Sequence, residues 1–251
     1  MKRALNLFLT IIFILPFVFF LVLSFASEYY YPEMFPANLT ISHFVQMIQT
    51  DSSILECLFT SLIISLSTAC LSTLFGFIVS KSLAYHSKKK LFQMICYLPF
   101  AFSPVIFAYC LNYFFNSFDL SGNAFGIILA QFIVTFPFAL ILFMNHWSVN
   151  LKASEQLVYT LGGSVWQTYK LILIPMSKSI IIICFFQTFL ISWFDYGLTS
   201  VIGLSKVQTL TIRMYQYINE SNIYFAALGS CLLIFPPIIL LWMNKNMVFK
   251  T

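Results

Sequence analysis

Charged side chains are scarce in this sequence. Lysine, arginine, aspartate and glutamate make up only 8% of the 251 residues, whereas hydrophobic residues make up 60% and the mean hydropathy is +0.90. Soluble globular domains carry about 25% charged residues, so the composition excludes that class. A net charge of +5 would suggest a nucleic-acid partner in a soluble protein, but here the basic residues follow membrane topology. The sequence predicts an integral membrane protein that contacts lipid and binds no nucleic acid.

Motifs for catalysis and for metal binding are also missing. No GxxxxGK[ST] phosphate loop occurs, so the chain cannot hydrolyse ATP by that route. The six cysteines form no CxxC pair, and His43, His86 and His146 are scattered, so we expect no metal and no cofactor. No Ser-His-Asp or paired-carboxylate pattern supports an intramembrane hydrolase. The sequence predicts a chain that is not itself an enzyme.

Long hydrophobic runs organise the chain. A transmembrane helix needs roughly 20 predominantly apolar residues. Runs of this kind predict an all-α, polytopic membrane domain over residues 1–251, with six spans at about 5–26, 55–83, 91–115, 124–147, 176–196 and 223–243. Prolines inside the third, fourth and sixth runs predict kinked helices whose freed carbonyls are satisfied by packed neighbours.

The basic residues set the orientation of these spans. Of the 13 lysines and arginines, only Lys206 and Arg213 fall on the side opposite the termini. An excess of positive charge marks the cytoplasmic face of a membrane protein. Both termini and the segment 150–175 between spans 4 and 5 are therefore predicted to be cytoplasmic.

That cytoplasmic segment has the pattern of two short helices joined at an elbow. Ser154 is the predicted N-cap of the first helix, and Gly162-Gly163 provides the residue type that ends helices in a left-handed conformation. Ser164 and Gln167 have the spacing of a capping box. Apolar residues then recur at helical spacing until a proline breaks the pattern. So small a helical pair needs a partner to cover its apolar face.

The elbow resembles the "EAA" loop of permease subunits of binding-protein-dependent ABC importers. The loop's glycine, Trp-Gln pair, aromatic residue, isoleucine, leucine and proline have counterparts in Gly162, Trp166, Gln167, Tyr169, Ile172, Ile174 and Pro175. Gln156 stands at the family's glutamate position, and an acid, Glu155, comes one residue earlier. The resemblance implies that ATPase coupling is carried by Glu155, Gln156, Gly162, Gly163, Trp166, Tyr169 and Pro175, with Trp166 and Tyr169 on the docking surface.

In that family, the loop forms coupling helices that dock on cytoplasmic ATPase subunits. ATP-driven closure of the ATPases then swings the membrane helices between inward-facing and outward-facing states. The resemblance therefore implies a transmembrane subunit in the plasma (inner) membrane. Its implied partners are ABC ATPase subunits, a second permease subunit that is identical or a sibling, and an extracytoplasmic substrate-binding protein.

A second resemblance concerns the solute. The stretch Ser192–Ile218 is similar to the end of the fifth span and the following outer segment in permeases of the polyamine, thiamine and ferric-iron branch. Gly203 and Thr209-Leu210 match that branch, whereas Thr211 stands where it usually has proline. This similarity implies a small solute and favours an organic cation, a polyamine, a thiamine-like compound or iron, while the residues leave a metal complex or a small anion open.

Four polar residues in or near the spans are candidates for a translocation path. Asp195 follows the fifth span, where an acid either lines a pathway or caps a helix in the outer interface. Asn112, Gln131 and Gln187 are mid-span amides that could line the path, although interhelical hydrogen bonds are the commoner use of such residues.

Two competing interpretations remain. The elbow could be an amphipathic pair lying on lipid, which would require a wide apolar face and a basic rim. Alternatively, the protein could be a stand-alone channel or a membrane-assembly protein that uses the elbow as a partner-binding site.

Overall fold

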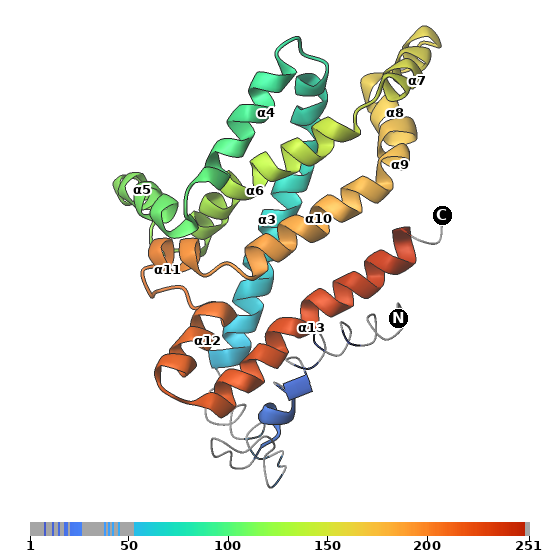
Figure 1. The fold of residues 1–251 in the computed structure, drawn as a ribbon. Coiled ribbons are helices and arrows are strands. Elements are labelled where there is room, and N and C mark those ends of the chain that lie inside the picture. The colour runs from blue at the N-terminus through green and yellow to red at the C-terminus, as the bar shows by residue number, and fades with distance from the viewer. Residues whose placement is uncertain are drawn as a thin grey trace. The chain divides into compact units, whose positions relative to one another are not determined.

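A computed structural model of the protein (Figure 1) describes most of the chain. It describes residues 53–248, and for 149, 150 and 243–248 it describes the backbone alone. Before residue 53 it describes only residues 8, 12, 15, 18, 19, 21–26, 38, 40, 42 and 45. Over residues 53–248 every element is a helix, in agreement with the predicted all-α class. The chain forms two compact units. Unit 1 contains residues 1–61 and 208–238, and unit 2 contains residues 62–207 and 239–251.

Three helices in the described part of the chain are long and apolar enough to cross a membrane. They are α3 (Ser53–Ala84), α6 (Ala124–His146) and α13 (Ile223–Val248). Two bent helix pairs raise the number of candidate spans to at most five. The run at 5–26 lies largely outside the described residues, so the six-span plan stays a prediction.

The bent pairs lie where spans 3 and 5 are predicted. The first joins α4 (Lys89–Tyr97) and η1 (Leu98–Ala101) to α5 (Pro104–Ser117) at 98°, and the second joins Val165–Met176 to α10 (Lys178–Trp193) at 76°. The first break has a local cause. Ser103 is extended, with ψ 135°, because a residue before proline is disfavoured in helical conformation. A break in the helix near Pro104 is therefore confirmed, while the assignment of α4, η1 and α5 to one span stays a prediction.

Small residues bring α3 and α6 into close contact within unit 2. Ser65, Thr68, Ser72, Gly76 and Ser80 are buried at three- and four-residue intervals on one face of α3. A Cβ at Gly76 would lie 2.6 Å from the Cβ of Ala139, so the backbones approach as closely as glycine allows. The hydroxyls of Ser72 and Thr135 share a hydrogen bond of 2.6 Å across this contact. Small residues and interhelical hydrogen bonds are the usual means of packing helices in a bilayer.

The elbow, residues 149–176, lies at one end of unit 2 (Figure 1). Its first arm is α7 (Val149–Thr160). Its second arm is α8 (Val165–Thr168), the π-helix η2 (Tyr169–Leu173) and α9 (Ile174–Met176). At the opposite end of the unit, α5 packs against α11 (Gly197–Gly203) around Ala108, Ile127 and Ile202.

Unit 1 contains a helix that the sequence analysis did not identify. The segment 197–222, predicted only to be an outer segment, holds α11 in unit 2 and α12 (Leu210–Asn219) in unit 1. Thr209 caps α12, and Leu210 N donates to Ser61 Oγ at 2.8 Å. A Cβ at Gly229 of α13 would meet Met214 Sδ at 2.0 Å, so α12 and α13 pack closely.

Candidate functional site

The elbow begins earlier than its sequence predicts. Helix α7 starts at Val149, and its N-cap Ser148 accepts a hydrogen bond from Leu151 N at 3.4 Å. The predicted N-cap, Ser154, lies inside the helix, so that prediction is wrong. An N-cap residue needs an extended backbone, and Ser148 has it, with ψ 167°, because α6 has ended at His146 and Trp147 is already extended.

The turn between the two arms needs both glycines, for different reasons. Gly162 has a φ of +79°, and its N–H donates to the carbonyl of Tyr159 at 3.0 Å. Gly163 N donates to Val158 O at 2.9 Å, and a Cβ at Gly163 would lie 2.3 Å from Val158 Cγ1. The predicted left-handed end of the first helix is confirmed at Gly162.

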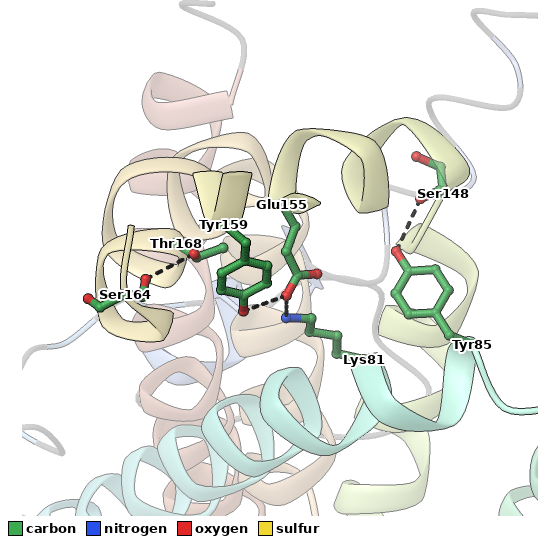
Figure 2. Close-up of polar contacts among 7 residues, drawn as sticks. All are labelled: Lys81, Tyr85, Ser148, Glu155, Tyr159, Ser164 and Thr168. Atoms are coloured by element: carbon green, nitrogen blue, oxygen red, sulfur yellow. Dashed lines mark hydrogen bonds and ion pairs between the residues drawn. The ribbon is translucent and has the colours of Figure 1, made fainter. Parts of the chain in front are cut away.

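The second arm begins with the predicted capping box. Ser164 N donates to Gln167 Oε1 at 2.7 Å, and Gln167 N donates to Ser164 Oγ at 3.3 Å. Thr168 Oγ1 donates a further hydrogen bond to the carbonyl of Ser164 at 3.0 Å (Figure 2). These contacts confirm the local prediction and fix where the second arm leaves the turn.

The second arm breaks next to Pro175, in agreement with the sequence prediction. The helix continues through α9 to Met176, and the 76° bend follows there. The reason lies in the π-helix just before it, in which Ile174 N donates to Tyr169 O, five residues back. A wider π turn shifts the preceding carbonyls, so the missing N–H and the ring of proline are accommodated without ending the helix.

An ion pair ties the elbow to the end of α3. Lys81 Nζ pairs with Glu155 Oε1, and Tyr159 OH donates to the same oxygen at 3.0 Å (Figure 2). The Lys81 Nζ also lies 4.9 Å from the centroid of the Tyr169 ring, which packs edge-on against Phe77 at 6.2 Å. Both arms therefore contact the same turn of α3.

A second tie lies at the base of α7. Tyr85 OH donates to the carbonyl of Ser148 at 3.1 Å (Figure 2). Lys152 Nζ lies 5.0 Å from the centroid of the Tyr85 ring. Burial raises the pKa of the Tyr85 phenol, and the negative charge of Glu155 raises it further. The phenol therefore stays protonated and able to donate at neutral pH.

Apolar side chains flank the turn of the elbow and remain exposed. We call Leu157, Leu161, Val165 and Trp166 the apolar tip, and their side chains are 60%, 80%, 59% and 71% exposed. Trp166 also lines an apolar cavity of about 850 Å³ between the second arm, α3 and α10. Gln156 is exposed as well, whereas Tyr169 is only half-exposed and faces α3. Tyr169 lines the same cavity as Trp166, so the two residues predicted to form the docking surface lie close together but differ in exposure.

The structure brings two of the four path candidates together. Gln131 is buried, and its Nε2 donates to Asp195 Oδ2 at 3.3 Å and to Thr199 Oγ1 at 3.0 Å. Its Oε1 accepts hydrogen bonds from the hydroxyls of Ser192 and Thr68. This network joins α3, α6, α10 and α11 beside a cavity of about 380 Å³. Sequence reasoning missed its hydroxyl partners, although hydroxyl residues recur along α3 at helical spacing.

The other two candidates lie elsewhere. Asn112 Oδ1 accepts a hydrogen bond from Ser121 Oγ at 2.8 Å, so it closes the turn between α5 and α6. Gln187 is exposed on α10. Neither side chain lines the cavity beside Gln131 and Asp195.

Asp195 acts as a cap for α11. Its Oδ2 accepts from Thr199 N at 2.9 Å and from Thr199 Oγ1 at 2.7 Å, and its Oδ1 accepts from Leu198 N at 3.4 Å. These are the backbone donors that the first turn of a helix leaves unpaired. The geometry agrees with the helix-capping interpretation, while a role in the path stays a prediction.

Exchanging Asp195 separates these two roles. Asparagine caps helices about as well as aspartate, whereas alanine at a cap costs about 0.5–2 kcal/mol. We expect Asp195→Asn to keep the thermal stability and the transport rate of the wild type, and Asp195→Ala to unfold at a lower temperature in detergent. If Asp195→Asn unfolds like the wild type but transports several-fold more slowly, the carboxylate charge acts in the path.

Comparison with known proteins gives one informative similarity. No protein-family model matches the chain. It is 26% identical over 186 residues to the Probable sulfate transport system permease protein cysT of Helicosporidium sp. subsp. Simulium jonesii, which covers 67% of this chain and 67% of that relative. Together with the long apolar helices, this similarity fits a multi-pass membrane permease of a transport system.

Proposed function

We propose that this protein is the transmembrane subunit of an ABC importer and that the elbow is its coupling segment. The observation that carries the proposal is the apolar tip. Four apolar side chains flank a turn fixed by a positive-φ glycine and a capping box, and the base of the elbow is held by an ion pair. An exposed apolar patch on a rigid support marks a surface for a partner.

The proposed partner is a cytoplasmic ABC ATPase, because the chain carries no phosphate loop and needs an external source of energy. Closure of two ATPase subunits would displace the elbow and, through it, the membrane helices. Alternating access requires a second bundle to move against, so we also propose a second permease subunit. A binding protein would deliver the solute on the opposite face, with both termini of this chain in the cytoplasm.

For the solute, two similarities point in different directions. The relative's name specifies sulfate, whereas the stretch Ser192–Ile218 resembles permeases for polyamines, thiamine and ferric iron. We propose a small polar solute from one of these classes. Uptake of labelled sulfate, putrescine, thiamine and ferric iron into cells with and without the protein identifies the class.

The coupling proposal is tested by copurification and transport. We expect the tagged protein, extracted from its native membrane, to bring down an ATPase with a phosphate loop. We also expect Gly162→Val to lower uptake at least tenfold, because the left-handed conformation costs an L-residue about 1–2 kcal/mol, and more when it is β-branched.

The matched control is Gly162→Asn, because asparagine tolerates the left-handed conformation. It should keep most of the uptake. If no ATPase copurifies and Gly162→Val transports normally, the importer proposal fails. Passive solute flux through the purified protein in liposomes would then favour a stand-alone channel.

A further inference from the structure

A single lysine holds both arms of the elbow. Lys81 lies in the last turn of α3. It pairs with Glu155 of the first arm, and its Nζ lies 4.9 Å from the Tyr169 ring centroid in the second arm. In the sequence these two partners stand on opposite sides of the glycine turn. Neither arm can therefore leave α3 without losing a contact to Lys81.

The surroundings make this contact stronger than a surface ion pair. The side chains of Lys81 and Glu155 are only 15% and 12% exposed, so water and salt screen their attraction less. Tyr159 donates a hydrogen bond to the same carboxylate oxygen. On the other arm, the Tyr169 ring contacts both the ammonium group and Phe77, which is one turn earlier in α3.

Other charges of the elbow do not share this arrangement. Glu155 is the single acidic residue in the sequence from 149 to 176. Lys170 in the second arm is exposed, and Lys152 in the first arm lies over Tyr85 instead. Because the one carboxylate of the elbow faces Lys81, a protein docked on the apolar tip meets no negative charge from the elbow.

We infer that Lys81 is a positioning residue that makes the elbow and the end of α3 move as one body. This inference rests on the proposed function, because the displacement that Lys81 transmits is the one that an ATPase imposes on the elbow. α3 in turn packs on α6 through its row of small residues, so a tilt of the elbow reaches the core of unit 2.

The test measures coupling and assembly separately. Replacing Lys81 by methionine alone would leave a carboxylate without its cation, so the main variant is Lys81→Met combined with Glu155→Gln, which removes both charges. In the whole transporter we expect this variant to bind the ATPase as the wild type does. The number of solute molecules moved per ATP hydrolysed should fall by roughly tenfold, within the range of measured coupling effects.

Two controls complete the design. Lys81→Arg keeps both the ion pair and the contact with the ring, so it should stay within about twofold of wild type. Lys170→Met removes an exposed lysine of the same elbow and should also stay within about twofold, as expected for a surface charge.

Hydrogen exchange of the protein in lipid nanodiscs gives a readout independent of transport. The doubly neutral variant should lose protection in both arms, whereas Tyr169→Leu should lose it in the second arm alone. The inference is overturned if the doubly neutral variant moves as many solute molecules per ATP as the wild type and its amides are equally protected from hydrogen exchange. A wild-type protein that recruits no ATPase would instead contradict the proposed function, while the exchange experiment would still decide whether Lys81 holds both arms.

Discussion

Uptake is expected to fall about 100-fold when Leu161 and Trp166 are both replaced by glutamate, a loss that corresponds to about 2.7 kcal/mol of docking free energy. Both side chains are exposed in the apolar tip, so the chain alone should still fold. In a complex they would be buried by the ATPase, and an unpaired carboxylate buried at an interface is strongly unfavourable. The measurement is ATPase binding to the permease in nanodiscs, with uptake as the second readout.

The control is Gln156→Glu, which places one new charge, as each single variant does, on an exposed position of the first arm outside the apolar tip. It should bind the ATPase at least as well as wild type, because the EAA loop that the elbow resembles has glutamate at the corresponding position. The single variants Leu161→Glu and Trp166→Glu should give intermediate losses. Unchanged ATPase binding by the double variant would place the docking surface elsewhere.

Gly76→Val is expected to be the most destabilising change in the packing of α3 on α6. A Cβ at this position would lie 2.6 Å from the Cβ of Ala139 and 3.4 Å from its carbonyl carbon, and valine adds two further methyl groups. Overpacking of this kind costs about 1–3 kcal/mol. A loss of about 2 kcal/mol in the free energy of unfolding should lower the unfolding temperature of a chain of this size by about 4–8 °C.

A compensating pair tests whether the contact itself is responsible. Gly76→Ala should lower the unfolding temperature, and adding Ala139→Gly should restore most of it, because the second change removes the atom that clashes. With the single variant Ala139→Gly, these proteins form a complete double-mutant cycle for one helix contact. Losses that simply add in the double variant would show that α3 and α6 do not meet at this point.

Local patterns predict the features of the elbow that depend on neighbouring residues. Gly162 adopts the left-handed conformation, and Ser164 with Gln167 forms the capping box, because both features involve residues within a few positions of each other. The same reasoning is wrong at Ser154, and at Pro175 it places the break one residue early. Which serine caps a helix depends on where the preceding helix ends, and a π turn changes what a proline can tolerate.

Hydrophobic run length likewise predicts α3, α6 and α13, since each run needs only its own composition to be recognised. The helix α12 was missed because its apolar side chains are mixed with polar ones, and its start depends on a cap at Thr209. The bend before Pro104 was predicted as a kink, and the extended conformation of Ser103 makes it sharper.

The sequence by itself determined that this protein is helical, belongs in a membrane and carries a glycine-hinged elbow, because composition, run length and capping chemistry are local properties. Only the tertiary structure decided which side chains meet. Lys81 contacts Glu155, which is 74 positions away in the sequence, and Gln131 contacts Asp195, which is 64 positions away. Contacts over such separations depend on how helices pack, and the row of small residues on α3 sets that packing by letting α6 approach closely.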